Sequence, residues 1–179
     1  MPLEDRKASR MFCRYGFSAL IPILCIVFLF SACGNDPVKS DLINYLDVRL
    51  PKIISLETEA GTDFSNVTGN QYKGDTVMLQ ALDEKIIPKY SKFLADLKLI
   101  KPETDEVKAI QVKYVEGATE INNGFIFLAE GLRKRNENTV MRGNAMVDAG
   151  ARKIREVNGL IGELARKHDI AINTVMPEN

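Results

Sequence analysis

The histidine and carboxylate residues of this chain are not spaced as a catalytic group. His168 is the single histidine, and it ends a long helical pattern, where an imidazole suits the negative end of the helix dipole. Glu116 and Glu120 are one helical turn apart, with Glu130 further along, and paired carboxylates can bind a metal or act as acid and base. Di-iron bundles, however, also need a Glu-x-x-His pair, which this sequence lacks. We therefore expect a solvated helix face here, with no catalytic residue, no metal and no cofactor.

Other reactive motifs are also missing from the sequence. It has no Gly-rich phosphate loop, no serine nucleophile motif and no Cys/His zinc spacing, so we do not expect an enzyme. The 147 residues after position 32 carry 20 basic and 22 acidic side chains. This balance gives no electrostatic reason to bind nucleic acid.

Cys33 is the cysteine whose surroundings carry information. The uncharged run 17–30 follows Arg6, Lys7, Arg10 and Arg14 and leads into small residues before Cys33. Basic, then apolar, then small residues is the layout of a secretory signal. The apolar run is shorter than the ~20 residues of a membrane-spanning helix. We therefore expect residues 1–32 to be a signal peptide.

Residues 29–33, Leu-Phe-Ser-Ala-Cys, resemble the lipobox that ends the signal peptides of bacterial lipoproteins. Ser31, Ala32 and Cys33 match it, while Phe30 stands where leucine is usual. The resemblance implies a diacylglycerol on the Cys33 thiol, cleavage before Cys33, and a further acyl chain such as palmitate on the new amine. Two or three chains would anchor the protein lastingly in a membrane.

The resemblance also implies a division of the chain and an address. Residues 33–36 would be a lipidated tether and residues 37–179 a helical domain in the bacterial cell envelope, outside the cytoplasm. An uncleaved transmembrane anchor over 15–32 is the alternative. Met1 and Met11 both fit as the first residue.

The rest of the sequence predicts four amphipathic helices, from apolar residues that recur in steps of three and four. Asp36 and Pro37 are typical of a helix start, and Pro51 and Pro88 should kink or break the helices that contain them. Short links at two of the three junctions favour an all-α fold, an up-and-down four-helix bundle after the N-terminal lipoprotein signal peptide. The expected helices cover residues 37–60, 75–100, 104–135 and 139–168, with a polar connection over 61–75 and an extended tail over 169–175.

Glycines at intervals of seven are the most unusual feature of the last two helices. They are Gly117, Gly124 and Gly131 on the third helix and Gly143 and Gly150 on the fourth. Each glycine in a helix costs ~1 kcal/mol relative to alanine, so the column needs a reason. Close packing of the two helices is one reason, and a groove for a ligand or a partner helix is the other.

These observations predict a lipid-anchored cell-envelope lipoprotein with a non-catalytic helical domain that has a binding or structural role. Its expected partners are the membrane, through Cys33, and another envelope protein. The alternative is a small-molecule or metal carrier with a cavity between the third and fourth helices, lined by the glycines. A basic cluster fits an ordinary charged surface or a contact with anionic lipid head groups. It consists of Arg133, Lys134 and Arg135, to which the fourth helix adds Arg142, Arg152, Lys153 and Arg155.

Overall fold

The computed structural model describes residues 36–171, and the fold is all-helical there, with no strand in that range. The predicted all-α class is therefore confirmed. The signal peptide, Cys33 and the tail beyond residue 171 lie outside the described residues. The α-helices are α1 (Pro37–Ile43), α2 (Ile54–Ser65), α3 (Asp75–Ala81), α4 (Ile87–Leu99), α5 (Asp105–Lys134) and α6 (Glu137–Lys167).

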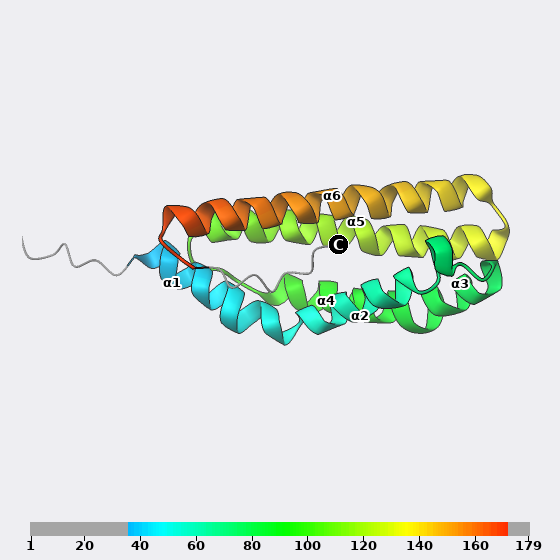
Figure 1. Ribbon diagram of the computed structural model, residues 1–179, viewed down its shortest axis with the longest axis horizontal. Coiled ribbons are helices and arrows are strands. Elements are labelled where there is room, and N and C mark those ends of the chain that lie inside the picture. The colour runs from blue at the N-terminus through cyan, green and yellow to red at the C-terminus, as the bar shows by residue number, and fades with distance from the viewer. Residues whose placement is uncertain (1–35, 172–179) are drawn as a thin grey trace, which may run out of the picture. The chain divides into compact units, whose positions relative to one another are not determined.

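The main helix pairs are α5 with α6, α4 with α5, and α2 with α4. The helices α5 and α6 run side by side and antiparallel, α4 packs against α5, and α2 packs against α4 (Figure 1). Within the described range, no helix is both long enough and apolar enough to cross a membrane.

Two aspartates hold α1 in place, one at its N-cap and one within the helix. Asp36 accepts hydrogen bonds from the Val38 and Lys39 amides at 3.0 and 3.1 Å, which satisfies free N–H groups of the first turn. Asp41 is buried and accepts bonds from the amides of Glu103 and Thr104 at 2.9 and 2.7 Å. The second aspartate therefore attaches α1 to the residues that lead into α5.

A π-helical turn precedes each of the two prolines for which we predicted a kink. The turns cover Asn44–Arg49, two residues before Pro51, and Leu82–Ile86, two residues before Pro88. A proline has no N–H, and its ring collides with the carbonyl four residues earlier, so a wider turn relieves the clash. After Pro51 the helical path breaks at Ile53, whose φ of −124° is not helical.

The predicted end of the first helix at Ala60 is wrong, because α2 continues through Gly61 to Ser65. The reason is a tertiary contact. The ring of Phe64 packs against that of Phe125 at 4.9 Å between centroids, and burial of this kind outweighs the poor helix propensity of glycine. The connection to α3 is correspondingly shorter than predicted and contains a 3₁₀ turn over Gly69–Gln71.

The apolar stripe predicted on the third helix faces the core. Every predicted position except Leu132, which is partly buried, is buried along α5: Val107, Ile110, Tyr114, Ala118, Ile121, Phe125 and Leu128. On α6, Val140, Val147 and Ile154 recur every seven residues and are partly buried against the same core. The heptad spacing thus identified the contact faces of both long helices.

The five glycines lie where α5 and α6 meet, and we call this contact the glycine seam. A Cβ atom at Gly124 would be 2.7 Å from Val147 Cγ2 and 2.9 Å from the Gly143 carbonyl oxygen. A Cβ at Gly143 would be 2.7 Å from the Leu128 amide nitrogen. Each helix thus places glycines opposite large side chains of the other, and the two backbones approach more closely than any side chain would allow.

The seam predicts that Gly124→Ala destabilises the protein although alanine is the better helix former. The new methyl group would meet backbone atoms at under 3.0 Å, and overpacking of this kind costs about 1–3 kcal/mol. Urea unfolding of the variant measures the loss. The matched control is Gly159→Ala on α6, where a Cβ meets nothing within 4 Å. The control should be unchanged or up to ~1 kcal/mol more stable. Equal stability changes in the two variants would contradict the close contact.

Candidate functional site

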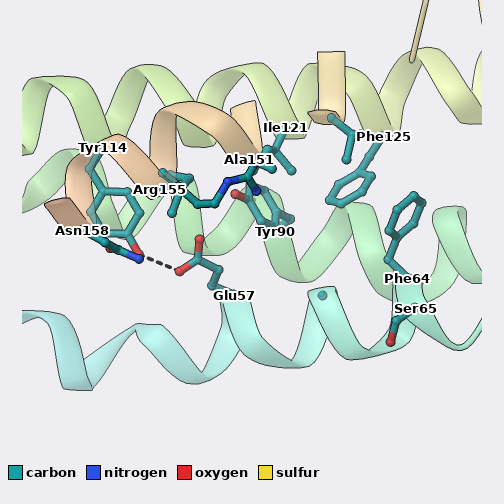
Figure 2. Close-up of a pocket in the computed structure, with 13 residues that line it drawn as sticks. Glu57, Phe64, Ser65, Tyr90, Tyr114, Ile121, Phe125, Ala151, Arg155 and Asn158 are labelled. Atoms are coloured by element: carbon teal, nitrogen blue, oxygen red, sulfur yellow. Dashed lines mark hydrogen bonds between the residues drawn. The ribbon is translucent and has the colours of Figure 1, made fainter. Parts of the chain in front are cut away.

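A cavity of about 390 Å³ lies among α2, α4, α5 and α6. Figure 2 shows its lining side chains, which come from all four helices. The size is in the range of small-molecule sites. The lining residues are Glu57, Gly61, Phe64, Ser65, Tyr90, Tyr114, Ile121, Phe125, Val147, Ala151, Ile154, Arg155 and Asn158.

Small residues on opposite walls leave the space open. Gly61 contributes no side chain from α2, and a Cβ built there would meet nothing within 4 Å. Ala151 faces the cavity from α6 with only a methyl group. The glycine that the sequence placed in a loop is therefore part of the cavity wall.

The cavity is apolar and aromatic at one end (Figure 2). Phe125 of α5 lies between Phe64 of α2 and Tyr90 of α4, with ring centroids 4.9 and 5.3 Å away. The Tyr90 and Phe125 rings meet edge to face, a favourable arrangement for aromatic pairs. Ile121 and Ile154 add aliphatic side chains to the cavity lining.

The other end of the cavity holds a carboxyl group. Glu57 lies in the first turn of α2, seven residues before Phe64, which is about 10 Å along the helix axis. The Tyr114 hydroxyl donates a hydrogen bond to Glu57 Oε2 at 2.6 Å. The second oxygen of Glu57 accepts no hydrogen bond from any described residue. Burial raises the pKa of Glu57 to about 7, and the Tyr114 and Tyr90 hydroxyls, which favour the charged carboxylate, only partly offset this rise.

Two further oxygen atoms beside Glu57 are buried and have no hydrogen-bond partner within residues 36–171: Tyr90 Oη and Asn158 Oδ1. Burial and then the Glu57 charge raise the pKa of Tyr90 well above its ordinary value, so this hydroxyl lies within the field of the carboxylate. Buried polar atoms are normally satisfied, and unpaired ones in a cavity wall indicate a place for a bound molecule.

The predicted glycines do not line this cavity. All five lie in the glycine seam, against backbone and side-chain atoms of the facing helix. The cavity lies instead beside the seam, toward α2 and α4.

The carboxylates singled out in the sequence do not come together. Glu130 pairs with Lys134 at 2.6 Å, Glu120 lies 3.9 Å from Lys153, and Glu116 is exposed. Across residues 36–171, no three His, Cys, Asp or Glu side chains are grouped so that they could hold a metal ion.

His168 has a partner that the sequence did not reveal. Its Nδ1 lies 2.6 Å from Asp36 Oδ2, and this bond holds the pKa of Asp36 below its ordinary value. The Lys39 ammonium group donates to the Asp169 carbonyl at 2.9 Å beside it. The contacts attach the end of α6 to the start of α1, so His168 has a structural role.

No family model, curated protein or solved structure matches this chain. The function must therefore be argued from the site itself.

Sequence reasoning missed Glu57, although a signal for it is present. Glu57 follows Ile53 by four residues and precedes Ala60 by three, and both neighbours are buried. A carboxylate at that spacing falls on the apolar face of a helix, where charged residues are rare without a partner. The early end assigned to this helix hid the pattern, because the stripe continues to Phe64.

The raised pKa of Glu57 predicts a pH-dependent stability cost. The folded chain binds the Glu57 proton more tightly than the unfolded chain does, so the cost is absent below pH 4.5 and complete above pH 7. A shift from 4.5 to about 7 corresponds to about 3 kcal/mol. Glu57→Gln should therefore gain stability over the wild type as the pH rises from 5 to 8.

Urea unfolding of both proteins across this pH range measures the difference. The two proteins differ only at position 57, so the contributions of all other groups cancel. A constant difference from pH 5 to pH 8 would show that the Glu57 carboxyl is not buried.

Proposed function

We propose that this protein is a lipid-anchored lipoprotein of the bacterial cell envelope whose helical domain binds a small molecule without catalysing a reaction. The lipobox-like segment ending at Cys33 supports the proposed location in the cell envelope. The absence of a nucleophile or metal motif in the sequence supports a binding role. The proposed domain covers residues 37–179, after a signal peptide over 1–32 and a tether over 33–36.

The finer fold that goes with this proposal is an up-and-down four-helix bundle. Its first two arms would be bent, α1 with α2 and α3 with α4, and its last two would be α5 and α6. The packing of α2 on α4, α4 on α5, and α5 on α6 supports this order. Binding sites in such bundles lie between facing helices, which is where the cavity lies.

The cavity is the observation on which the proposed function depends. A protein with a purely structural role gains nothing from an apolar cavity of about 390 Å³ that holds a carboxyl group and unpaired oxygens. Voids and unsatisfied polar atoms both lower stability. Their coincidence at one place supports a binding site over a defect of packing.

The contact between the side chains of Asp36 and His168 places the start of α1 beside the end of α6 and supports a tether at that end of the domain. Cys33 is three residues before Asp36 in the chain, which limits their separation to about 11 Å. Residues 133–135 precede the start of α6, and the 31 residues of α6, about 45 Å in length, separate them from His168. An anchor near His168 would therefore hold Arg133, Lys134 and Arg135 away from the lipid surface, and we favour an ordinary charged surface for these three residues.

Gly61→Leu tests the binding site without harming the fold. The leucine side chain would enter the cavity, where nothing lies within 4 Å of its Cβ, and it favours the helix by up to ~1 kcal/mol. We expect stability to be kept and binding of the neutral apolar dye N-phenyl-1-naphthylamine to weaken about tenfold or more. Dye fluorescence on the mature chain 33–179 with Cys33→Ala measures binding, since residues 36–171 bury a core of their own.

Gly159→Leu is the matched control for this experiment. The position is an exposed glycine of α6 with equal space around it, outside the cavity. It should bind the dye as the unsubstituted chain does. Dye binding that is absent from the starting chain, or unaffected by Gly61→Leu, would overturn the proposed function.

Cys33→Ala tests the anchor in the full chain. In a bacterial cell the unsubstituted chain should incorporate labelled palmitate and sediment with membranes, because acylation at Cys33 supplies lasting membrane binding. The variant should do neither. Recovery of the unsubstituted chain without label, and with its first 32 residues attached, would contradict the lipoprotein assignment.

A further inference from the structure

The polar end of the cavity offers hydrogen-bond acceptors in excess of donors. The Glu57 carboxylate has one oxygen without a partner, Asn158 Oδ1 is buried and unpaired, and Tyr90 Oη has no partner among the described residues. The Tyr114 hydroxyl already donates its hydrogen bond to Glu57. The Tyr90 hydroxyl carries one proton of its own, so a bound molecule that satisfies the Glu57 and Asn158 oxygens must bring at least one further hydrogen-bond donor.

Charge narrows the choice of donors. Glu57 is the acidic residue in the cavity lining, and the nearby rings of Tyr90 and Phe125 present π-electron surface. An ammonium group has three N–H donors and a positive charge, so it pairs with a carboxylate and is attracted to aromatic faces. A ligand carboxylate at the same place would instead set two negative charges together.

The opposite end of the cavity selects for an apolar body. From Glu57 the lining continues along α2 to Phe64, about 10 Å away along the helix axis, and is aromatic or aliphatic over most of that length. Figure 2 shows the two ends, with Glu57 and Tyr114 together and Phe64 apart from them. The shape matches a molecule with one polar end and an apolar tail.

We propose that the cavity binds an amphiphilic primary amine, with its ammonium group between Glu57, Tyr90 Oη and Asn158 Oδ1 and its apolar part against Phe64, Phe125 and Ile121. This inference rests on the proposed binding function and adds the chemical class of the ligand. A metal ion is a poorer occupant, because the lining supplies a single carboxylate where hard cations take several charged oxygen ligands.

Arg155 is the residue that could favour the opposite charge. It lines the cavity from α6 but is exposed and forms no ion pair with a described residue. Water screens a charge at that position, whereas the Glu57 carboxyl lies in a medium of low polarity, where electrostatic interactions are stronger. We therefore assign the recognition of charge to Glu57 and not to Arg155.

A matched series of probes tests the ligand class. Calorimetry at pH 8 compares 4-phenylbutylamine with the neutral 4-phenylbutanol and the anionic 4-phenylbutyrate on the mature chain with Cys33→Ala. A charge-assisted hydrogen bond in a buried site should make the amine bind about tenfold or more tightly than the alcohol. At pH 6.5 amine binding should also release protons, because the ligand's charge favours the ionised form of Glu57.

Two variants assign the preference to a residue. Glu57→Gln should bind the amine and the alcohol alike. Glu156→Gln makes the same chemical change at an exposed position of α6 outside the cavity lining, and it should keep the full preference. Arg155→Ala should also keep it.

The outcomes separate this inference from the proposed function. Equal binding of amine and alcohol, tighter binding of the butyrate, or a preference that survives Glu57→Gln would overturn the amine assignment. Each of these results leaves the binding function standing as long as the dye binds and Gly61→Leu prevents it.

Discussion

The close approach of α5 and α6 is the constraint on which the rest of the structure depends. At the glycine seam, Gly150 would place a Cβ 2.6 Å from the Gly117 carbonyl oxygen, so only glycine allows the observed contact. Glycines weaken both helices in isolation, and the contact between backbones and interlocking side chains must compensate. Because α6 packs chiefly against α5, its side chains do not fill the space that separates α6 from α2 and α4. The cavity is that space.

The chemistry of the cavity follows from the polar groups in its walls that have few or no hydrogen-bond partners. Glu57 accepts one hydrogen bond from Tyr114, and the buried oxygens of Tyr90 and Asn158 lie in the same cavity wall. Its raised pKa means that the fold is less stable at neutral pH with this carboxyl than it would be without it. A group that lowers stability and packs poorly is typical of functional sites. Tyr90 and Asn158 strengthen the case, because their unpaired oxygens lie in the same wall.

Several elements could be predicted because their causes are local. Asp36 caps α1 through its own neighbours, and Pro51 and Pro88 disturb helices by steric effects within one turn. The end of α2 could not be predicted in this way, since Phe64 extends it by packing against Phe125, more than 60 positions away in the chain. The partner of His168 was likewise hidden, because Asp36 is separated from it by 132 residues.

The sequence by itself determined the helical class, the apolar faces of the long helices and the positions where two helices can approach closely. These properties follow from periodicity, proline and the missing side chain of glycine, all of which act within a few residues. Only the tertiary structure decided that Gly61 of α2 and Ala151 of α6 line the same cavity and that Glu57 lies in its wall. Burial is a property of what surrounds a side chain, and those surroundings come from helices far apart in the chain.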